Sequence, residues 1–307
     1  MNHRLLAGVA TVTIGAALGL FLWGDAYQLR LGTILAMYIA LACGWNLIGG
    51  MAGYPSFATA AFFGLGAYAG ALTQVKGVPM VLAWTFAAVV AATVALAIGW
   101  IVLRLRGHYF AIASFALVIV LREIVTNWTG LTGGGMGVSL PMLQTSVVEQ
   151  ARLFFTAQAV LAALAVTVSL FVASSWLGFA LQCVRQNESA AGMLGLDARR
   201  VKAVAFCISS AILGAAGAIY ASSIFYIDPS DVFDILLSVK PIVMAMLGGA
   251  GTVAGPVLGA LLFLILEQTV WASFLSVHSA ILGALVVALA VFLPRGLFGR
   301  RLRRRLA

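Results

Sequence analysis

The stretch PMVLAWTFAAVVAATVALAIGWIVL, residues 79–103, contains no charged side chain. A helix rises about 1.5 Å per residue and the hydrocarbon core of a bilayer is about 30 Å thick, so this stretch is long enough to cross a membrane as one helix. The rest of the chain has the same character. Of its 307 residues, 63% are hydrophobic and 9% are charged, whereas soluble domains carry about 25% charged residues. The sequence therefore predicts an integral membrane protein.

Apolar runs separated by charged or turn-rich breaks predict ten transmembrane helices. No clear small-x-small cleavage site follows the first run, so we interpret this run as a helix that is retained rather than as a signal peptide. The expected fold class is all-α, a polytopic membrane bundle of about ten helices that forms a single domain over residues 1–307. The expected spans are 5–24, 31–50, 56–75, 79–103, 108–127, 153–176, 201–223, 233–249, 255–274 and 278–294.

The distribution of basic residues predicts the orientation of the chain. If the N-terminus is cytoplasmic, thirteen of the eighteen basic residues fall in cytoplasmic segments, and Arg30, Lys76 and Arg152 fall outside. This bias agrees with the positive-inside rule, and it places both termini, including the basic tail 295–307, in the cytoplasm. The net charge of +9 is accounted for by anionic lipid, so no nucleic-acid partner is expected. The cytoplasmic set is Arg4, Arg104, Arg106, Arg185, Arg199, Arg200, Lys202, Arg295, Arg300, Arg301, Arg303, Arg304 and Arg305.

Two connections are longer than simple turns. The outer one, 128–152, contains a glycine run at 133–137 that forms either a binding loop or a sharp return of the chain. In the cytoplasmic one, 175–202, Asn187 or Ser189 can cap a short helix. We expect that helix to lie across the cytoplasmic face.

The residue patterns of enzymes are missing from the sequence. The three histidines lie on different segments, and the three cysteines are far apart with no CxxC pair, so no metal site is expected. The chain contains no HExxH, GxSxG or GxxxxGK[ST] sequence. The sequence therefore predicts a protein that is not an enzyme, binds no cofactor and does not hydrolyse ATP by itself.

Ionisable residues inside the predicted spans are few. Charges near the bilayer centre are costly, so they are usually paired or functional. Lys240, next to Pro241, and Glu267 fall at similar depth in their spans, and we hypothesise that they form an intramembrane ion pair. Arg122 and Glu123 lie close enough to the end of their span to extend toward water.

Glycines cluster in the third and seventh spans, as Gly64-x-Gly66-x-x-x-Gly70 and Gly214-x-x-Gly217. Small residues let helix backbones approach closely, which is one interpretation. The other is a broken helix around 54–56 that opens a path at mid-membrane, and both can hold together.

Four stretches of the chain, taken together, resemble one known family. They are GGMAGYPSFATAAFFGLGAYAGAL at 49–72, RLRGHYFAI at 104–112, NWTGLTGG at 127–134 and GGAGTVAGPVLGA at 248–260. The chain resembles the permeases of branched-chain amino-acid ABC transporters, and among them the M-type subunit, over about residues 30 to 295. The resemblance implies a bacterial inner-membrane permease that pairs with a homologous H-type permease, docks two cytoplasmic ATPases and receives its solute from a periplasmic binding protein.

The resemblance also implies roles for particular residues. The segment 177–200 would be the coupling loop, in which Arg185, Asn187, Glu188, Ala191, Gly192 and Gly195 match the part of the family that contacts the ATPases. ATP would be used by those partner subunits. Movement of this loop would switch the path from outward to inward access.

The solute is less constrained by the sequence. Candidates for the translocation path are Tyr54, Ser56, Phe57, Asn127 and Thr129. The family commonly has SLGH where this chain has residues 54–57, so a branched-chain amino acid, urea and other small polar solutes all stay open. The rival mechanism is an ion-gradient-driven secondary transporter, which would need a membrane carboxylate such as Glu267 or Glu123.

Overall fold

A computed structural model describes residues 25–273 of the chain. The predicted first span, 5–24, the predicted tenth span, 278–294, and the basic tail 295–307 lie outside the described residues.

The described part is built from helices, and the all-α prediction is confirmed. The only strands among the described residues are β1 (Val138–Ser139) and β2 (Tyr226–Ile227), which pair antiparallel with Val138 opposite Ile227. The longer helices are α2 (Ala26–Trp45) with its π-helical continuation η1 (Asn46–Met51), α3 (Thr59–Val75), α4 (Met80–Val102), α5 (His108–Asn127), α7 (Val147–Ser174), α10 (Ala198–Ile224), α12 (Ile235–Gly248) and α13 (Ala254–Ser273). The short ones are α6 (Thr129–Thr132), η2 (Gly134–Met136), α8 (Trp176–Gln186), α9 (Glu188–Met193) and α11 (Pro229–Val232).

Five helical segments in the described part are long and apolar enough to cross a membrane: 26–51, 80–102, 108–127, 147–174 and 198–224. Helices α3 and α12 have 17 and 14 residues, which is less than the roughly 20 that a full span needs. The protein is thus a multi-helix membrane bundle, but these helices do not establish the predicted count of ten spans.

The predicted start of the sixth span, residue 153, is wrong by six residues. Helix α7 begins at Val147 because Ser146 caps it: its hydroxyl accepts from the Glu149 backbone N–H, and the Glu149 carboxylate accepts from the Ser146 N–H at 3.1 Å. This reciprocal capping box satisfies two backbone donors that a helix start leaves unpaired. The connection from 128 is correspondingly shorter and contains α6, η2 and β1.

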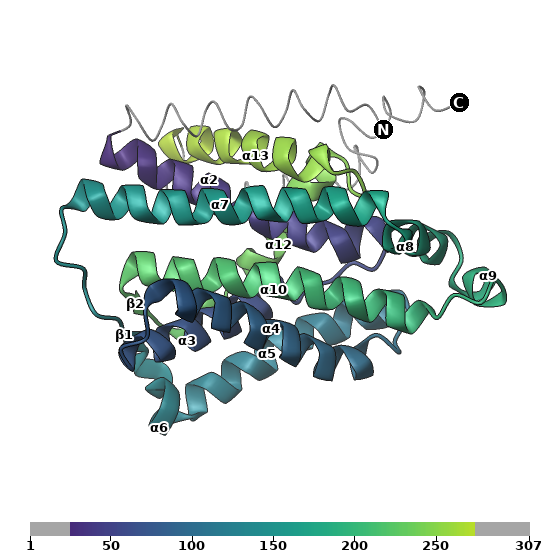
Figure 1. The fold of residues 1–307 in the computed structure, drawn as a ribbon, viewed down its shortest axis with the longest axis horizontal. Coiled ribbons are helices and arrows are strands. Elements are labelled where there is room, and N and C mark those ends of the chain that lie inside the picture. Colours follow the sequence, from purple (N-terminus) through teal and green to yellow (C-terminus); the bar gives the residue numbers. More distant parts are fainter. Residues whose placement is uncertain (1–24, 274–307) are drawn as a thin grey trace.

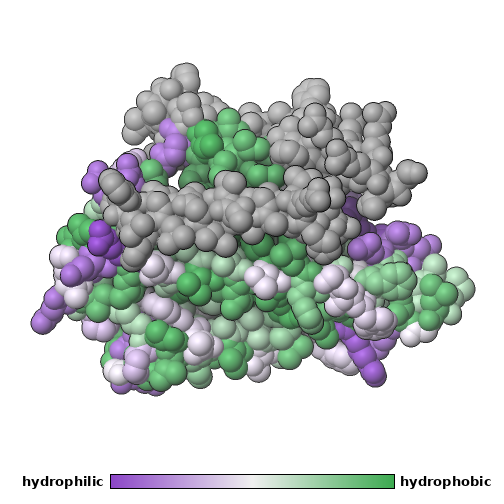
Figure 2. Space-filling model, turned by 45° about the horizontal axis from the view of Figure 1, so that its top comes forward, coloured by the Kyte–Doolittle hydropathy of each residue, from purple (hydrophilic) through white to green (hydrophobic). Residues whose placement is uncertain are grey.

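Helix α10 is the centre of the bundle (Figure 1). It packs against α3 and α4 on one side and against α2 and α7 on the other, while α12 packs against α13. The pair of short strands lies at one end of the bundle and the α8–α9 segment at the other. Figure 2 shows hydrophobic residues over the middle of the visible face and hydrophilic residues toward its two ends, as expected for a surface in contact with lipid.

The seam between α3 and α10 depends on glycine. A Cβ atom on Gly66 would overlap the carbonyl of Gly214, and a Cβ atom on Gly217 would overlap the carbonyl of Phe63. The close-packing interpretation of these two clusters is therefore confirmed at this seam.

Replacing Gly217 by Ala is expected to destabilise the bundle by about 1–3 kcal/mol, because the two backbones must separate to admit the methyl group. Gly130 on α6 is a matched control, since a Cβ atom there meets nothing within 4 Å. Thermal aggregation of the purified proteins, followed by size-exclusion chromatography, measures the difference. Equal stability of Gly217→Ala and Gly130→Ala would show that the seam tolerates wider spacing.

Candidate functional site

Residues 52–58, between η1 and α3, are not helical, and Pro55 lies within them. A break in an apolar bundle needs partners for its backbone groups. The Phe57 N–H donates to Ser114 Oγ of α5 at 2.9 Å, and Ser238 Oγ of α12 donates to the Phe57 carbonyl at 2.6 Å. Side chains from two other helices thus replace the hydrogen bonds that a continuous helix would have made.

The end of η1 meets the glycine-rich turn 249–253. Asn46 is fully buried; its Nδ2 donates to the Thr252 carbonyl at 2.9 Å, and its Oδ1 accepts from the Gly251 N–H at 2.7 Å. A Cβ atom on Gly50 would lie 2.5 Å from the Gly251 nitrogen. The glycine-containing end of η1 and the turn 249–253 are therefore in backbone contact.

Arg185, at the end of α8, is attached to this junction. Its Nη1 donates to the Gly50 carbonyl at 2.6 Å. Gly53 has a φ of +75°, and a Cβ atom on it would lie 2.8 Å from Arg185 Cγ. The predicted coupling segment, 177–200, is thus in direct contact with the break through Arg185.

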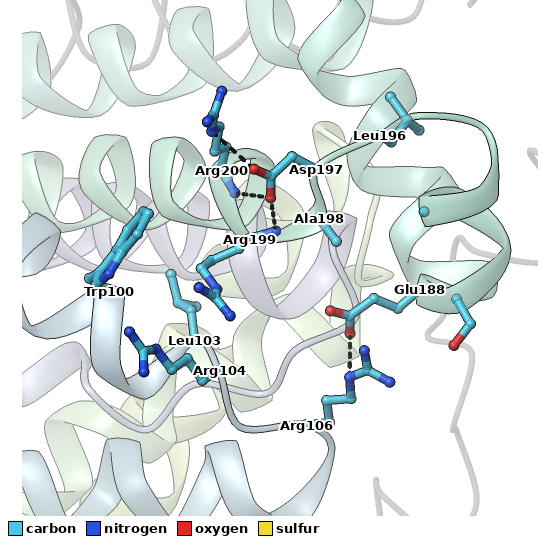
Figure 3. Close-up of a pocket in the computed structure, with 12 residues that line it drawn as sticks. Trp100, Leu103, Arg104, Arg106, Glu188, Leu196, Asp197, Ala198, Arg199 and Arg200 are labelled. Carbon is cyan, nitrogen blue, oxygen red and sulfur yellow. Dashed lines mark hydrogen bonds and ion pairs between the residues drawn. The ribbon is translucent and has the colours of Figure 1, made fainter.

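Glu188, the first residue of α9, is the centre of a polar cluster. The Tyr54 hydroxyl donates to Glu188 Oε2, and Lys202 Nζ lies 3.0 Å from Glu188 Oε1. Arg106 Nε lies 3.6 Å from Glu188 Oε2 (Figure 3). We name Tyr54, Arg106, Glu188 and Lys202 the Glu188 cluster. It connects α9 to the break, to the α4–α5 turn and to the start of α10.

The charges of the Glu188 cluster compensate one another. Lys202 is 1% exposed; its ammonium also donates to the Leu103 carbonyl at 3.2 Å and lies 4.2 Å from the centre of the Tyr54 ring. Burial raises the pKa of the Glu188 carboxyl, but hydrogen bonds from Tyr54 and Lys202 and the charges of Lys202 and Arg106 lower the pKa below its ordinary value overall. Glu188 is therefore an anion at neutral pH.

Helix α9 presents an apolar tip beside basic residues. Asn187 caps the helix, because its Oδ1 accepts from the Ser189 and Ala190 N–H groups, so the prediction of a capped short helix is confirmed. Ala191 is buried, whereas Met193 and Leu194 are 85% and 75% exposed. A Cβ atom on Gly192 or Gly195 would meet nothing within 4 Å.

A cavity of about 380 Å³ separates α9 from the ends of α4 and α10 (Figure 3). Four arginines and Glu188 line it, so this end of the molecule carries positive charge around an exposed short helix. The four are Arg104, Arg106, Arg199 and Arg200.

The five path candidates do not gather in one place. Ser56 and Phe57 lie at the break, and Tyr54 is in the Glu188 cluster. Asn127, at the other end of α5, and Thr129, at the start of α6, are both exposed. Asn127 is 13 residues from Ser114, which is about 20 Å along the helix. The structure thus brings a path candidate, Tyr54, together with a coupling candidate, Glu188, and leaves Asn127 and Thr129 apart from both.

The remaining pair of predicted residues lies between α12 and α13. Lys240 Nζ is 2.7 Å from Glu267 Oε1 and 3.3 Å from the Tyr38 hydroxyl of α2. Among the described residues there is no group of three or more His, Cys, Asp or Glu side chains placed to hold a metal ion.

Sequence reasoning missed two residues of this site. The charge count places Lys202 in a cytoplasmic loop, although it belongs to α10 and its side chain is buried. The signal for this burial is a lysine one helical turn after the start of a helix that is otherwise largely apolar. Asn46 had no assigned role, although it is a polar residue within an apolar run and directly precedes a glycine-rich turn.

Comparison with known proteins gives matches to transport permeases. Residues 28–302 match the family described as "Branched-chain amino acid transport system / permease component". The chain is 30% identical to the high-affinity branched-chain amino acid transport system permease protein LivM of Escherichia coli, over 87% of this chain and 69% of that protein. It is 27% identical to the permease protein LivH of the same organism, over 87% of this chain and 93% of that protein.

A more distant match is the probable branched-chain amino acid transport permease protein LivM of Methanocaldococcus jannaschii, which is 25% identical over 63% of this chain and 61% of that protein. No solved structure gives a significant match. The match to the family covers most of the chain and includes every element of the site described above, and the chain therefore belongs to the family of branched-chain amino acid transport system permease components.

Proposed function

We propose that this chain is the transmembrane permease subunit of an ABC importer that carries branched-chain amino acids across the bacterial inner membrane. The observation that carries the mechanism is the direct bond between Glu188 of α9 and Tyr54 of the broken segment. Family membership supplies the solute class, since the named relatives carry branched-chain amino acids.

Coupling follows from this contact. Closure of the ATPase subunits displaces α9, and the Glu188 cluster transmits the displacement to residues 52–58. Because these residues are held by side chains rather than by a continuous helix, they can change conformation without breaking a long hydrogen-bond ladder. ATP then shifts the population between outward-open and inward-open states.

The partners follow from the same proposal. Relatives named LivM and LivH both align with this chain, which supports pairing with a homologous second permease. Two cytoplasmic ATPases dock at α9, where Met193 and Leu194 are exposed, and a periplasmic binding protein delivers the solute. The chain has no GxxxxGK[ST] sequence, so the ATPase sites belong to the partners.

Orientation is proposed from charge. Basic residues concentrate at the end of the bundle that holds α9, in the cavity beside it. Three acidic residues lie at the other end of the bundle, between the C-terminal end of α10 and the N-terminal end of α12. They are Asp228, Asp231 and Asp234. The α9 end is therefore assigned to the cytoplasm, together with both termini. A proton-driven alternative has less support, because Glu267 is already paired with Lys240.

ATP-dependent uptake tests the solute and the energy source. We expect right-side-out or reconstituted vesicles that contain the complete transporter, with ATP in the lumen on the ATPase side, to accumulate radiolabelled leucine, isoleucine and valine supplied outside with the binding protein. Accumulation should survive collapse of the proton and sodium gradients. Uptake of urea without any of the three amino acids, or uptake that follows an ion gradient, would contradict the proposal.

A double-mutant cycle tests the Glu188 cluster. Glu188→Gln leaves the buried Lys202 ammonium without its carboxylate, and we expect it to lower stability by about 1–3 kcal/mol and to uncouple ATP hydrolysis from uptake. Lys202→Met in the Glu188→Gln background should recover part of the loss, with a coupling energy of about 0.5–3 kcal/mol.

The matched control is Arg200→Gln, which breaks the nearby exposed pair Arg200–Asp197. It should change stability by less than about 1 kcal/mol. It is a control for stability only, because Arg200 lies in the predicted coupling segment and lines the cavity beside α9. If the stability changes of Glu188→Gln and Lys202→Met were strictly additive, the two side chains would have no coupling energy. That result would contradict transmission of the α9 displacement through this pair.

A further inference from the structure

A second cavity, of about 330 Å³, lies between α2, the end of α10 and the start of α12. Its size is at the lower end of the range for small-molecule sites, about 300–1,000 Å³. It is far along the bundle from the Glu188 cluster, at the end that the proposed orientation places outside. Its lining combines one cation, two carboxylates, two tyrosines and aliphatic side chains.

Lys240 supplies the cation. An ammonium group has three donors, and two of them are used, by Glu267 Oε1 at 2.7 Å and by the Tyr38 oxygen at 3.3 Å. Within the part of the chain that the structure describes, no acceptor takes the third donor, which remains for a ligand. Tyr38 accepts from Lys240 through its oxygen, and no group among residues 25–273 accepts the Tyr38 hydroxyl proton, which is therefore also available. Two donors thus meet on one side of the cavity, which suits the two oxygens of a carboxylate.

Asp231 and Asp234 supply the anions. One oxygen of Asp234 accepts from the Leu236 N–H at 3.1 Å, whereas the Asp231 carboxylate makes no hydrogen bond or ion pair with any other residue that the structure describes. Burial raises the pKa of Asp231, and the charges of Asp228 and Asp234 raise it further. An ammonium group bound between the two carboxylates would relieve this repulsion.

The aliphatic part of the lining comes from Ile34 and Met37 of α2 and from Leu236 and Leu237 of α12. These side chains can cover a branched hydrocarbon chain and remove it from water. A simple cation would leave Lys240 facing a like charge, and a simple anion would face two carboxylates. A zwitterion with an aliphatic side chain matches all three parts of the lining.

We propose that this cavity is a binding site for an aliphatic α-amino acid, with the ligand carboxylate at Lys240 and Tyr38, its ammonium at Asp231 and Asp234, and its side chain against Leu236 and Met37. The inference rests on the proposed function and identifies where the permease itself first holds the solute. Recognition by this chain would then add to the selection made by the binding protein.

Binding of radiolabelled leucine to the purified complete transporter in nanodiscs, without its binding protein and without ATP, tests the site. Asp231→Asn should weaken binding at least tenfold, because the ammonium loses a charged partner. Leu236→Ala should weaken leucine binding about tenfold and alanine binding much less. Ile235→Ala is the matched control: Ile235 is 43% exposed and Leu236 is 42% exposed, but Ile235 does not line the cavity. It should stay within twofold of the unmodified protein.

Two further readouts keep the outcome decisive. The 2-oxo acid that corresponds to leucine lacks the ammonium group and should not compete with leucine. If Asp231→Asn fails to assemble, Leu236→Ala against Ile235→Ala decides. Where Lys240→Gln alone is unstable, the double variant Lys240→Gln/Glu267→Gln serves instead. It removes the ammonium group that binds the ligand carboxylate and leaves no unpaired carboxylate at Glu267.

The same preparation also measures ATP-dependent uptake, which separates the two levels of proposal. Normal leucine uptake together with no leucine binding, or with binding unchanged by Asp231→Asn and Leu236→Ala, overturns the site and leaves the transport function standing. Absence of uptake of any aliphatic amino acid by the unmodified transporter overturns the proposed function and the site with it.

Discussion

The non-helical segment 52–58 imposes the constraint on which the rest of this structure depends. Each unpaired backbone group in an apolar bundle costs several kcal/mol, so the break can exist only where other helices supply partners. Ser114 of α5 and Ser238 of α12 do so for the backbone of Phe57. The positions of these two helices are therefore fixed relative to α3 by the need to satisfy one interruption of the chain.

The same constraint explains the use of small residues. Serine hydroxyls reach the break only if their helices approach it closely, and α10 must leave room by packing tightly on the other side of α3. Glycines at 66 and 217 allow that approach, because any side chain there would meet a neighbouring carbonyl, while a side chain at Gly214 would meet the methyl group of Ala91 on α4. The glycine seam and the polar partners are thus two parts of one arrangement: close backbones on one face of α3 and short hydroxyl side chains on the other.

The sequence was sufficient for most of the long helices that the structure describes, because apolar runs are local signals. It offered a break near Pro55 only as one of two interpretations of the glycine-rich segments. It predicted the pairing of Lys240 with Glu267 only as a hypothesis from depth, and the structure places the two side chains in contact. It could not predict that Tyr54 meets Glu188, since 134 positions separate them and nothing local to either residue specifies the other.

Lys202 was misplaced for a related reason. A charge count assigns a lysine at a helix start to the loop, whereas burial depends on the partners that tertiary structure brings to it. The early start of α7 was readable from Ser146 and Glu149 and was missed because hydrophobicity alone defined the span.

A continuous series of contacts joins the cavity beside Lys240 to α9. Lys240, which lines the cavity, is two residues from Ser238 on α12, and Ser238 holds the backbone of Phe57 and Ala60 on either side of the end of the break. Tyr54, three residues earlier than Phe57, holds Glu188 at the start of α9. Every link in this series is a hydrogen bond or a rigid helical segment except residues 52–58, which have no ladder of their own. A two-state change is therefore easiest in that segment. In the proposed mechanism, occupancy of the cavity would act on it through α12, and the ATPases would act on it through α9. Binding free energies are reciprocal. If a partner docked at α9 changes the affinity of the cavity for solute by some factor, bound solute must change the affinity of α9 for that partner by the same factor.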